Sequence, residues 1–192
     1  MSEREEQAKA SYELRDGKLD GEVITYTETG RIEQKAHFKE GQLDGETILY
    51  DEQGSVAQKM SFKDGKLDGP MIIYQEGSAL AVVPYKNGKQ DGEAITYDEN
   101  GMVVLKAEYK DGKLNGVSTW YDKEGHVVKK SQFQDDKLEG YTAEFYKSGK
   151  VQVRSQFKAN KLDGEVIAFT EDGKVKERAF FKAGKPQPAQ HQ

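Results

Sequence analysis

The sequence predicts an all-β fold, an elongated and twisted single antiparallel sheet of tandem β-hairpins, and three observations predict it. The segment 17–41 (GKLDGEVITYTETGRIEQKAHFKEG) is written in seven copies along the 192 residues, with a step of 24 residues except for one step of 23. Apolar and polar residues alternate between the glycines, and a period of two is typical of strands. Short Gly-containing polar clusters separate these runs, and such short connections join antiparallel neighbours.

Each copy opens with a five-residue box, GKLDG at 17–21 in the first copy. The box recurs, with substitutions, at 41–45, 65–69, 88–92, 112–116, 136–140 and 160–164. An aromatic residue follows the last glycine of each box by five positions, and a turn glycine follows it by nine, or by eight in the third copy. Because each run is about five to eight residues long, every copy is expected to form two strands and one hairpin.

The repeats are expected to form a single domain over residues 11–185. Residues 1–10 are polar and read as a flexible lead-in, and residues 11–15 match the end of a repeat, so we expect a capping half-repeat strand there. The tail at 186–192 is polar and contains proline, which predicts disorder. A lone hairpin is marginal in water, so stability is expected from stacking each hairpin on the next.

Three copies depart from the pattern. Copy three is one residue short and carries Pro70 and Pro84. Proline cannot donate to a strand ladder, so we expect Pro84 and the deletion to bulge or bend the sheet, either as a tolerated distortion or as a bend that shapes a partner site. In copies six and seven, Asp136 and Asn160 replace the first glycine of the box. Both residue types tolerate the left-handed conformation that we expect there.

Strand parity divides the residues between two faces. The first face is expected to carry the structural apolar residues, which in copy one are Leu19, Ile24, Tyr26, Ile32, Ala36 and Phe38. The second face is polar in the outer copies but apolar in the middle ones. Its apolar members are Leu49, Met71, Ile73, Leu80, Val82, Met102, Val104, Trp120 and Val128. Soluble proteins rarely expose a large apolar patch, so this set predicts a partner-binding surface, with a second small core or a homodimer contact as alternatives.

No residue pattern indicates catalysis, a cofactor or a metal. The chain has no cysteine, its three histidines are scattered, and no G-x-S-x-G elbow or phosphate-binding loop is present. The box carboxylates, such as Asp20 and Asp44, recur two strands apart, about 9–10 Å, which is too far to share one cation. We expect them to bond the turn backbone instead. A net charge of −5 disfavours nucleic-acid binding.

The expected location is the cytoplasm. The N-terminal residues lack the apolar stretch of a signal peptide, and no apolar run reaches the length of a membrane span. The sequence therefore predicts a soluble protein, which would be periplasmic if a leader peptide had been removed.

The segments YKNGKQDG at 85–92, YKDGKLNG at 109–116 and ITYDENG at 95–101 resemble MORN repeats. They look most like the bacterial MORN-variant repeats of the YwqK-type antitoxin family, and the resemblance covers about 17–185. It implies a non-catalytic scaffold, and among bacterial members an immunity or antitoxin protein that binds and blocks a cognate toxin, often a secreted effector. Other MORN proteins are associated with phospholipid membranes or assembly, which implies a peripheral membrane or lipid-binding scaffold as the alternative.

Overall fold

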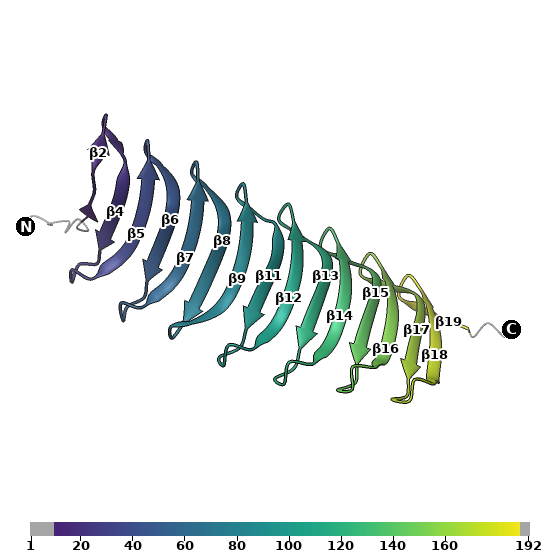
Figure 1. The fold of residues 1–192 in the computed structure, drawn as a ribbon. Helices are drawn as coiled ribbons and strands as arrows, with labels where there is room; N and C mark the ends of the chain where they lie inside the picture. The colour runs from purple at the N-terminus through teal and green to yellow at the C-terminus, as the bar shows by residue number, and fades with distance from the viewer. Residues whose placement is uncertain (1–9, 189–192) are drawn as a thin grey trace, which may run out of the picture. The chain divides into compact units, whose positions relative to one another are not determined.

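The computed structural model describes residues 10–188, and this part of the chain consists of strands and turns without a helix (Figure 1). The predicted all-β fold of tandem antiparallel hairpins is therefore confirmed. No helix in this range is long and apolar enough to cross a membrane. The chain divides into two compact units, Met1–Gln90 and Asp91–Gln192.

The first unit is a series of hairpins that pair in chain order. Its strands are β1 (Ala10–Ser11), β2 (Leu14–Arg15), β3 (Lys18–Leu19), β4 (Gly21–Tyr26), β5 (Ile32–Lys39), β6 (Gln42–Tyr50), β7 (Val56–Lys63), β8 (Lys66–Gln75), β9 (Ser78–Lys86) and β10 (Lys89–Gln90). From β4 to β9 each strand pairs antiparallel with the next. The expected capping strand at 11–15 is split, because β1 pairs with β4 whereas β2 pairs with β3.

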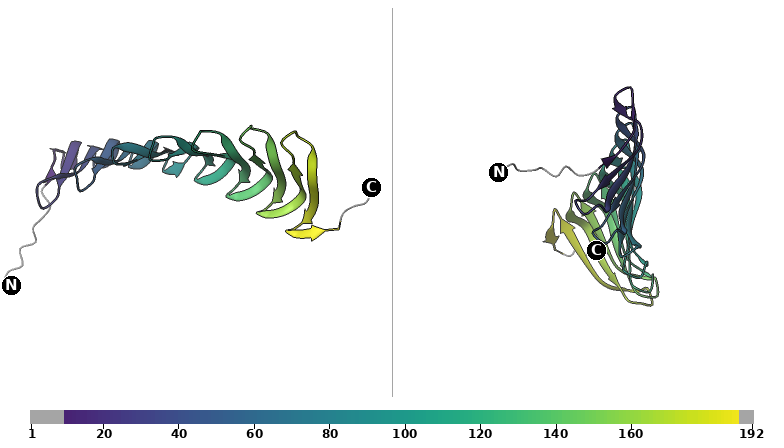
Figure 2. Two further views of the ribbon diagram at one scale, coloured as in Figure 1. Left: turned by 90° about the horizontal axis from the view of Figure 1, so that it is seen from below. Right: turned by 90° about the vertical axis from the view of Figure 1, so that its left-hand side faces the viewer.

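The second unit repeats this arrangement. Its strands are β11 (Gly92–Tyr97), β12 (Val103–Lys110), β13 (Lys113–Tyr121), β14 (Val127–Gln134), β15 (Lys137–Phe145), β16 (Val151–Lys158), β17 (Lys161–Phe169), β18 (Val175–Lys182) and β19 (Lys185–Gln187). Each strand pairs antiparallel with the next. Within each unit the described strands lie in one layer, with no second layer over either face (Figure 2).

The strands extend into both segments that were predicted to be flexible. Ala10 pairs with Thr25, so the lead-in does not reach residue 10, and residues 1–9 lie outside the described part. At the other end, Pro186 and Gln187 belong to β19 and pair with Phe181 and Phe180. The prediction of disorder was wrong for these two residues because β18 offers a free edge, and proline is tolerated on an outer strand. Residues 189–192 lie outside the described part.

The box turns have two consecutive residues with positive φ, as in type I′ hairpins. Glu40 and Gly41, for example, have φ values of 49° and 83°. The left-handed conformation predicted for the replaced glycines is confirmed, with φ of 65° at Asp136 and 67° at Asn160. Their side chains add a bond, because Asp136 Oδ1 accepts the Leu114 N–H at 2.8 Å. The equivalent oxygen of Asn160 accepts the Leu138 N–H at 2.7 Å.

A β-bulge in the hairpin of every repeat decides which residues share a face. In copy one Thr25 lies opposite Gln34, whereas Tyr26 lies opposite Ile32, so Glu33 is an extra residue. One extra residue moves the following side chains to the other face. As a result Ile24 lies opposite Lys35, and Ala36 lies opposite Val23.

The predicted assignment of Ile24, Tyr26, Ala36 and Phe38 to one face was therefore wrong. The prediction carried the alternation of side chains from one strand through the turn into the next, and it did not include the extra residue of the bulge. Directly opposed residues share a face, so we name the two faces by their members. The alanine face carries Ala36 and its equivalents, and the isoleucine face carries Ile24 and its equivalents.

The deletion in copy three lies in a turn. Gln75 pairs with Ser78, so only Glu76 and Gly77 remain in the loop, both with positive φ. Pro70 and Pro84 lie directly opposite each other within β8 and β9. The expected additional bulge is absent from this hairpin, whose only register shift, next to Tyr74, corresponds to the one beside Tyr26 in copy one. The shorter turn takes up the missing residue, so the strand ladder is kept.

Most of the buried residues are small and lie on the alanine face of one or the other unit. On the alanine face they are Ala36, Thr47, Ala107, Ser118, Ser131 and Thr142. On the isoleucine face, Ile167 is buried. All other described large apolar side chains remain at least partly exposed. Both units therefore expose side chains from both faces of a single sheet layer.

Candidate binding surfaces

Three of the nine predicted partner-binding residues come together on the alanine face of the first unit. Leu49 and Ile73 both lie opposite Gln58, and Met71 lies opposite Met60. Val82 lies opposite Ile72 and therefore belongs to the isoleucine face. Leu80 is the extra residue of the bulge between β8 and β9.

The four predicted residues of the second unit occupy different environments. Trp120 lies on the alanine face opposite Leu105 and Lys129, whose Nζ is 5.4 Å from the Trp120 ring centroid. Val104 and Val128 are the extra residues of two bulges, and Met102 lies in the turn before β12. The nine residues do not share one face. The prediction placed them together because it did not foresee the bulges. Their role in binding stays a prediction.

The alanine face of the first unit is uncharged. Between the box and the bulge of each repeat from β4 to β9, the residues paired on this face are Val23, Thr25, Gln34, Ala36, Thr47, Leu49, Gln58, Met60, Met71, Ile73, Ala81 and Val83. All except Ala36 and Thr47 are partly exposed. We call Leu49, Met60, Met71, Ile73 and Val83 the uncharged surface. Sequence reasoning missed Met60 and Val83 because it placed their column on the structural face.

A row of cations crosses the isoleucine face of the second unit. It consists of Lys106, Lys130, Arg154 and Arg178, each opposite uncharged residues on the neighbouring strands. The two outer cations have carboxylate partners on the same face. Lys106 Nζ lies 3.4 Å from Glu93, and Arg178 lies 3.2 Å from Glu165.

The two inner cations have no such partner among residues 10–188. Where other copies have Glu22, Glu46, Glu93 or Glu165, the fifth copy has Val117 and the sixth has Tyr141. Between the box and the bulge on β13 to β16, the paired residues of this face are Val117, Thr119, Lys130, Gln132, Tyr141, Ala143, Arg154 and Gln156, which include no carboxylate. We call Val117, Lys130, Tyr141 and Arg154 the cationic surface.

The side chains of the cationic surface are accessible. Val117 is 41% exposed and Tyr141 is 51% exposed, and Lys130 and Arg154 are also exposed. The Arg154 guanidinium lies 5.5 Å from the centroid of the Tyr141 ring, which is within the range of a cation–π contact. Two positive charges and an exposed aromatic ring thus stand together without a compensating acid.

The box carboxylates bond the turn backbone, as the sequence predicted. Each accepts a hydrogen bond from a backbone N–H about twenty residues further along the chain. The donors and acceptors are Glu40 to Asp20, Asp64 to Asp44, Asn87 to Asp68, Asp111 to Asp91, Ala159 to Glu139 and Ala183 to Asp163. At Asp163, a hydrogen bond from Lys182 is the main cause of a lowered pKa. Two of these carboxylates, Asp20 and Asp44, also line an exposed hollow. Their hydrogen bonds to the turn backbone already engage them.

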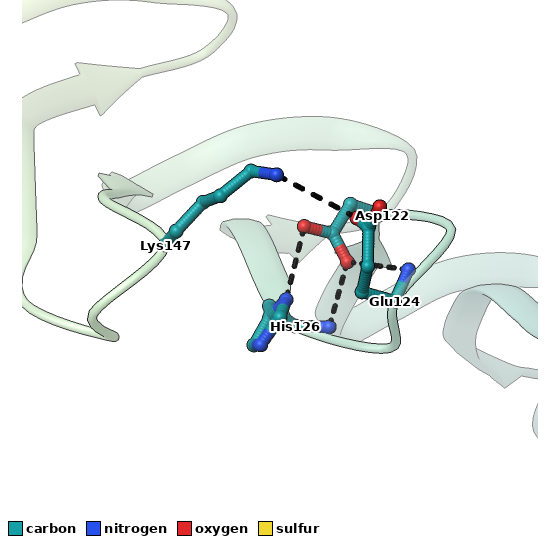
Figure 3. A network of polar contacts seen from close by, with 4 residues as sticks. All are labelled: Asp122, Glu124, His126 and Lys147. Carbon is teal, nitrogen blue, oxygen red and sulfur yellow. Dashed lines mark hydrogen bonds and ion pairs between the residues drawn. The ribbon is translucent and has the colours of Figure 1, made fainter.

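Asp122, Glu124 and His126 bring three potential metal-ligating atoms within 4.8 Å of one another in the turn between β13 and β14 (Figure 3). Sequence reasoning treated His126 as isolated and missed this group. Asp122 Oδ1 accepts the N–H groups of Glu124 at 3.0 Å and His126 at 2.8 Å, and Oδ2 contacts His126 Nδ1 at 3.2 Å. Asp51 and Asp98 make the same two backbone bonds in turns without histidine. The group is therefore explained by turn capping.

We expect Asp122→Ala to destabilise the protein at neutral pH and to matter less in acid. Burial acts to raise the pKa of Asp122, but hydrogen bonds from the His126 N–H, the His126 ring and the Glu124 N–H lower it below the ordinary 3.8. A lowered pKa stabilises the fold above the ordinary value, and this contribution is lost as the pH falls through the lowered one. Urea unfolding of the variant and the wild type, from neutral to acidic pH, measures this difference in stability. Glu124→Ala is the control, and a difference from wild type that grows in acid would contradict the assignment.

Hairpins in tandem, with turn carboxylates committed to the backbone and both faces accessible, define a β-hairpin repeat protein. Six segments, 19–40, 43–64, 90–111, 114–135, 138–159 and 162–183, match the family described as MORN repeat variant. They make up more than half of the sequence, and the chain belongs to this family. The third copy, with the deletion and both prolines, lies largely between the matched segments. MORN repeats suggest a scaffold that binds protein or membrane, and proteins built from them are generally non-catalytic.

The other comparisons add little. No curated protein matches the chain significantly. Among solved structures, accessory secretory protein 1, 2 and 3 of Streptococcus pneumoniae is 16% identical, with 63% of this chain and 20% of that chain covered and a TM-score of 0.24. A mutant of S. aureus TarM in complex with Fondaparinux, alpha-GlcNAc-glycerol and UDP is 10% identical, with 79% and 21% covered and a TM-score of 0.21. The chain spans about a fifth of each, and at these TM-scores neither likeness indicates a shared fold.

Proposed function

We propose that this protein is a non-catalytic scaffold that binds another protein, and that its partner is a bacterial toxin, which it blocks as an antitoxin or immunity protein in the cytoplasm. The observation that carries the protein-binding part is the uncharged surface of the first unit. The toxin and the cytoplasmic location come from the resemblance to bacterial MORN-variant antitoxins.

The uncharged surface has the composition of an interface centre. Charged residues are depleted from the centres of protein interfaces, and Met is enriched there. Met60 and Met71 lie directly opposite each other, and their flexible side chains can adapt to a partner's shape. All five side chains of this surface remain partly exposed, and neighbouring apolar side chains that stay accessible on one face mark interaction sites in soluble proteins.

A binding role also fits the polar chemistry of the described residues. The box carboxylates and Asp122 accept backbone hydrogen bonds, which commits them to holding turns. Occlusion of a toxin's active site would need a firm complementary surface and no reacting group. The repeated strand ladders support this proposal, because they hold the side chains of each face in a fixed array.

We expect Ile73→Glu to weaken binding of the partner at least about tenfold, because a carboxylate would be buried without a counter-ion in the interface. A toxin gene found next to the gene for this protein would supply the partner, and isothermal titration calorimetry would measure its binding. Ile72→Glu is the matched control, since Ile72 is the same residue type one position earlier and faces the opposite side. Circular dichroism confirms that both variants fold. Equal affinities for Ile73→Glu and Ile72→Glu would exclude the uncharged surface as the binding site.

A lipid-binding scaffold is the second candidate, and the row of cations on the second unit favours it. Cations near an anionic membrane each contribute about 1 kcal/mol of attraction. Co-sedimentation with anionic vesicles at low salt is the test, and absence of binding rejects this candidate.

A further inference from the structure

We propose that the cationic surface of the second unit binds an acidic protein segment in extended conformation. This site lies on the isoleucine face and is separate from the uncharged surface of the first unit. The proposal stands on its own observations, so either surface could fail its test while the other passes.

The first observation is that an acid and a base occur together at two fixed positions of the repeat. Four copies have Glu at the position of Val117, and each of these copies has Lys or Arg at the position of Lys130. In the second unit these pairs form ion pairs, Lys106 with Glu93 and Arg178 with Glu165. Copies five and six keep the cation and replace the acid. The two retained cations therefore lack the partner that the repeat normally provides, which leaves them available to an external carboxylate.

The second observation is the spacing of the two cations. Lys130 and Arg154 are two strands apart and both lie opposite Ala143 on β15. Strand spacing puts their Cα atoms about 9–10 Å apart. In a segment with the extended polyproline II conformation, which has three residues per turn and a rise of about 3.1 Å per residue, residues three apart lie on the same side and are separated by about 9 Å. An extended segment that crosses the strands can thus place one acidic side chain at each cation. The Tyr141 ring holds the Arg154 guanidinium and offers an apolar contact beside it.

The third observation is the limited width of the cationic surface. Glu93 and Glu108 lie on the same face on one side of it, and Glu165 lies on the other. A broad anionic plane such as a bilayer would meet these carboxylates together with the cations. A narrow acidic segment avoids this penalty.

The test uses a fluorescently labelled peptide with glutamate at every third residue, and anisotropy as the readout. Val117→Glu with Tyr141→Glu restores the residue that four other copies already carry, so these changes are compatible with the hairpin. We expect this double variant to bind the peptide at least about tenfold more weakly than wild type at low salt. The control is Val117→Gln with Tyr141→Gln, which loses the Tyr141 ring as the Glu double variant does and has nearly the same shape without the charge. It should bind the peptide clearly more tightly than the Glu double variant.

Several outcomes would overturn the proposal. One is an equal affinity of wild type and the Glu double variant, and another is an equal loss in the Gln and Glu variants. Binding of a peptide with glutamine in place of glutamate would show that charge is not recognised. Binding to anionic vesicles without binding to the peptide would identify a lipid as the occupant. A wild-type dimer that the Glu double variant dissociates, seen by analytical ultracentrifugation, would identify a second copy of the chain.

Discussion

Ile167→Ala is expected to lower the free energy of unfolding by about 2–4 kcal/mol, the range for removing a buried aliphatic side chain. Ile167 is only 3% exposed although it lies on an open face. It lies on β17 directly opposite Arg154 on one side and Arg178 on the other. Arginine stems can cover apolar surface while their charged ends stay in water. The alanine variant would leave a gap beneath these stems that the single sheet layer cannot close.

Urea unfolding followed by circular dichroism measures this loss, and Ile95→Ala is the matched control. Ile95 occupies the same position of the repeat in the fourth copy, where it is half-buried and lies opposite Lys106. Its replacement should cost clearly less, because less apolar surface leaves water in the folded state. Equal losses at Ile95 and Ile167 would show that the arginines do not provide the additional burial.

The sequence was sufficient to predict the repeat, the strands and the turns, because these depend on local residues. Glycine, Asn and Asp at fixed positions require particular backbone angles, and alternation within a run identifies a strand. The hydrogen bonds of Asp44 and Asp163 to the turns were foreseen for the same reason. These features repeat in each copy, so one copy supports the interpretation of the others.

Face assignment could not be predicted, because it depends on one residue per hairpin. Glu33 and Val128, for example, fill the extra position of a bulge, and neither residue type is characteristic of such a position. Since alternation has a period of two, an unrecognised extra residue exchanges the two faces for the rest of that strand. The predicted surface therefore mixed Ile73 from the alanine face with Val82 from the isoleucine face.

The cationic surface was also missed, although its sequence signal was available. Detecting this signal requires a comparison of two repeat positions across the copies. One is the position of Glu22 and its equivalents, and the other is the position of Lys35 and its equivalents. Only the register shows that these positions share a face, since Ile24 lies opposite Lys35 and Glu22 lies two residues before Ile24. The departure at Val117 and Tyr141 becomes informative once that neighbourhood is known.

The second large effect is expected at Gly69, where Gly69→Ala should cost about 3 kcal/mol of stability. Gly69 has a φ of +117°, and a Cβ atom built there would lie 2.9 Å from the Ser61 Cβ on the neighbouring strand. Backbone strain at such an angle is of order 1–3 kcal/mol, and the overlap adds to it. Gly54→Ala is the comparison, because Gly54 has a φ of +82° and open space around it. Strain alone should cost about 1–2 kcal/mol there.

A double-mutant cycle separates the two causes at Gly69. Ser61→Gly removes the atom that the new methyl group would meet, so Gly69→Ala should cost clearly less in that background than in the wild type. The difference between the two backgrounds, measured by urea unfolding, is the energy of the steric overlap. If Gly69→Ala cost the same with and without Ser61, the close approach of β7 and β8 would not restrict this position. The glycine would then be required for its backbone angle alone, as in the exposed turns.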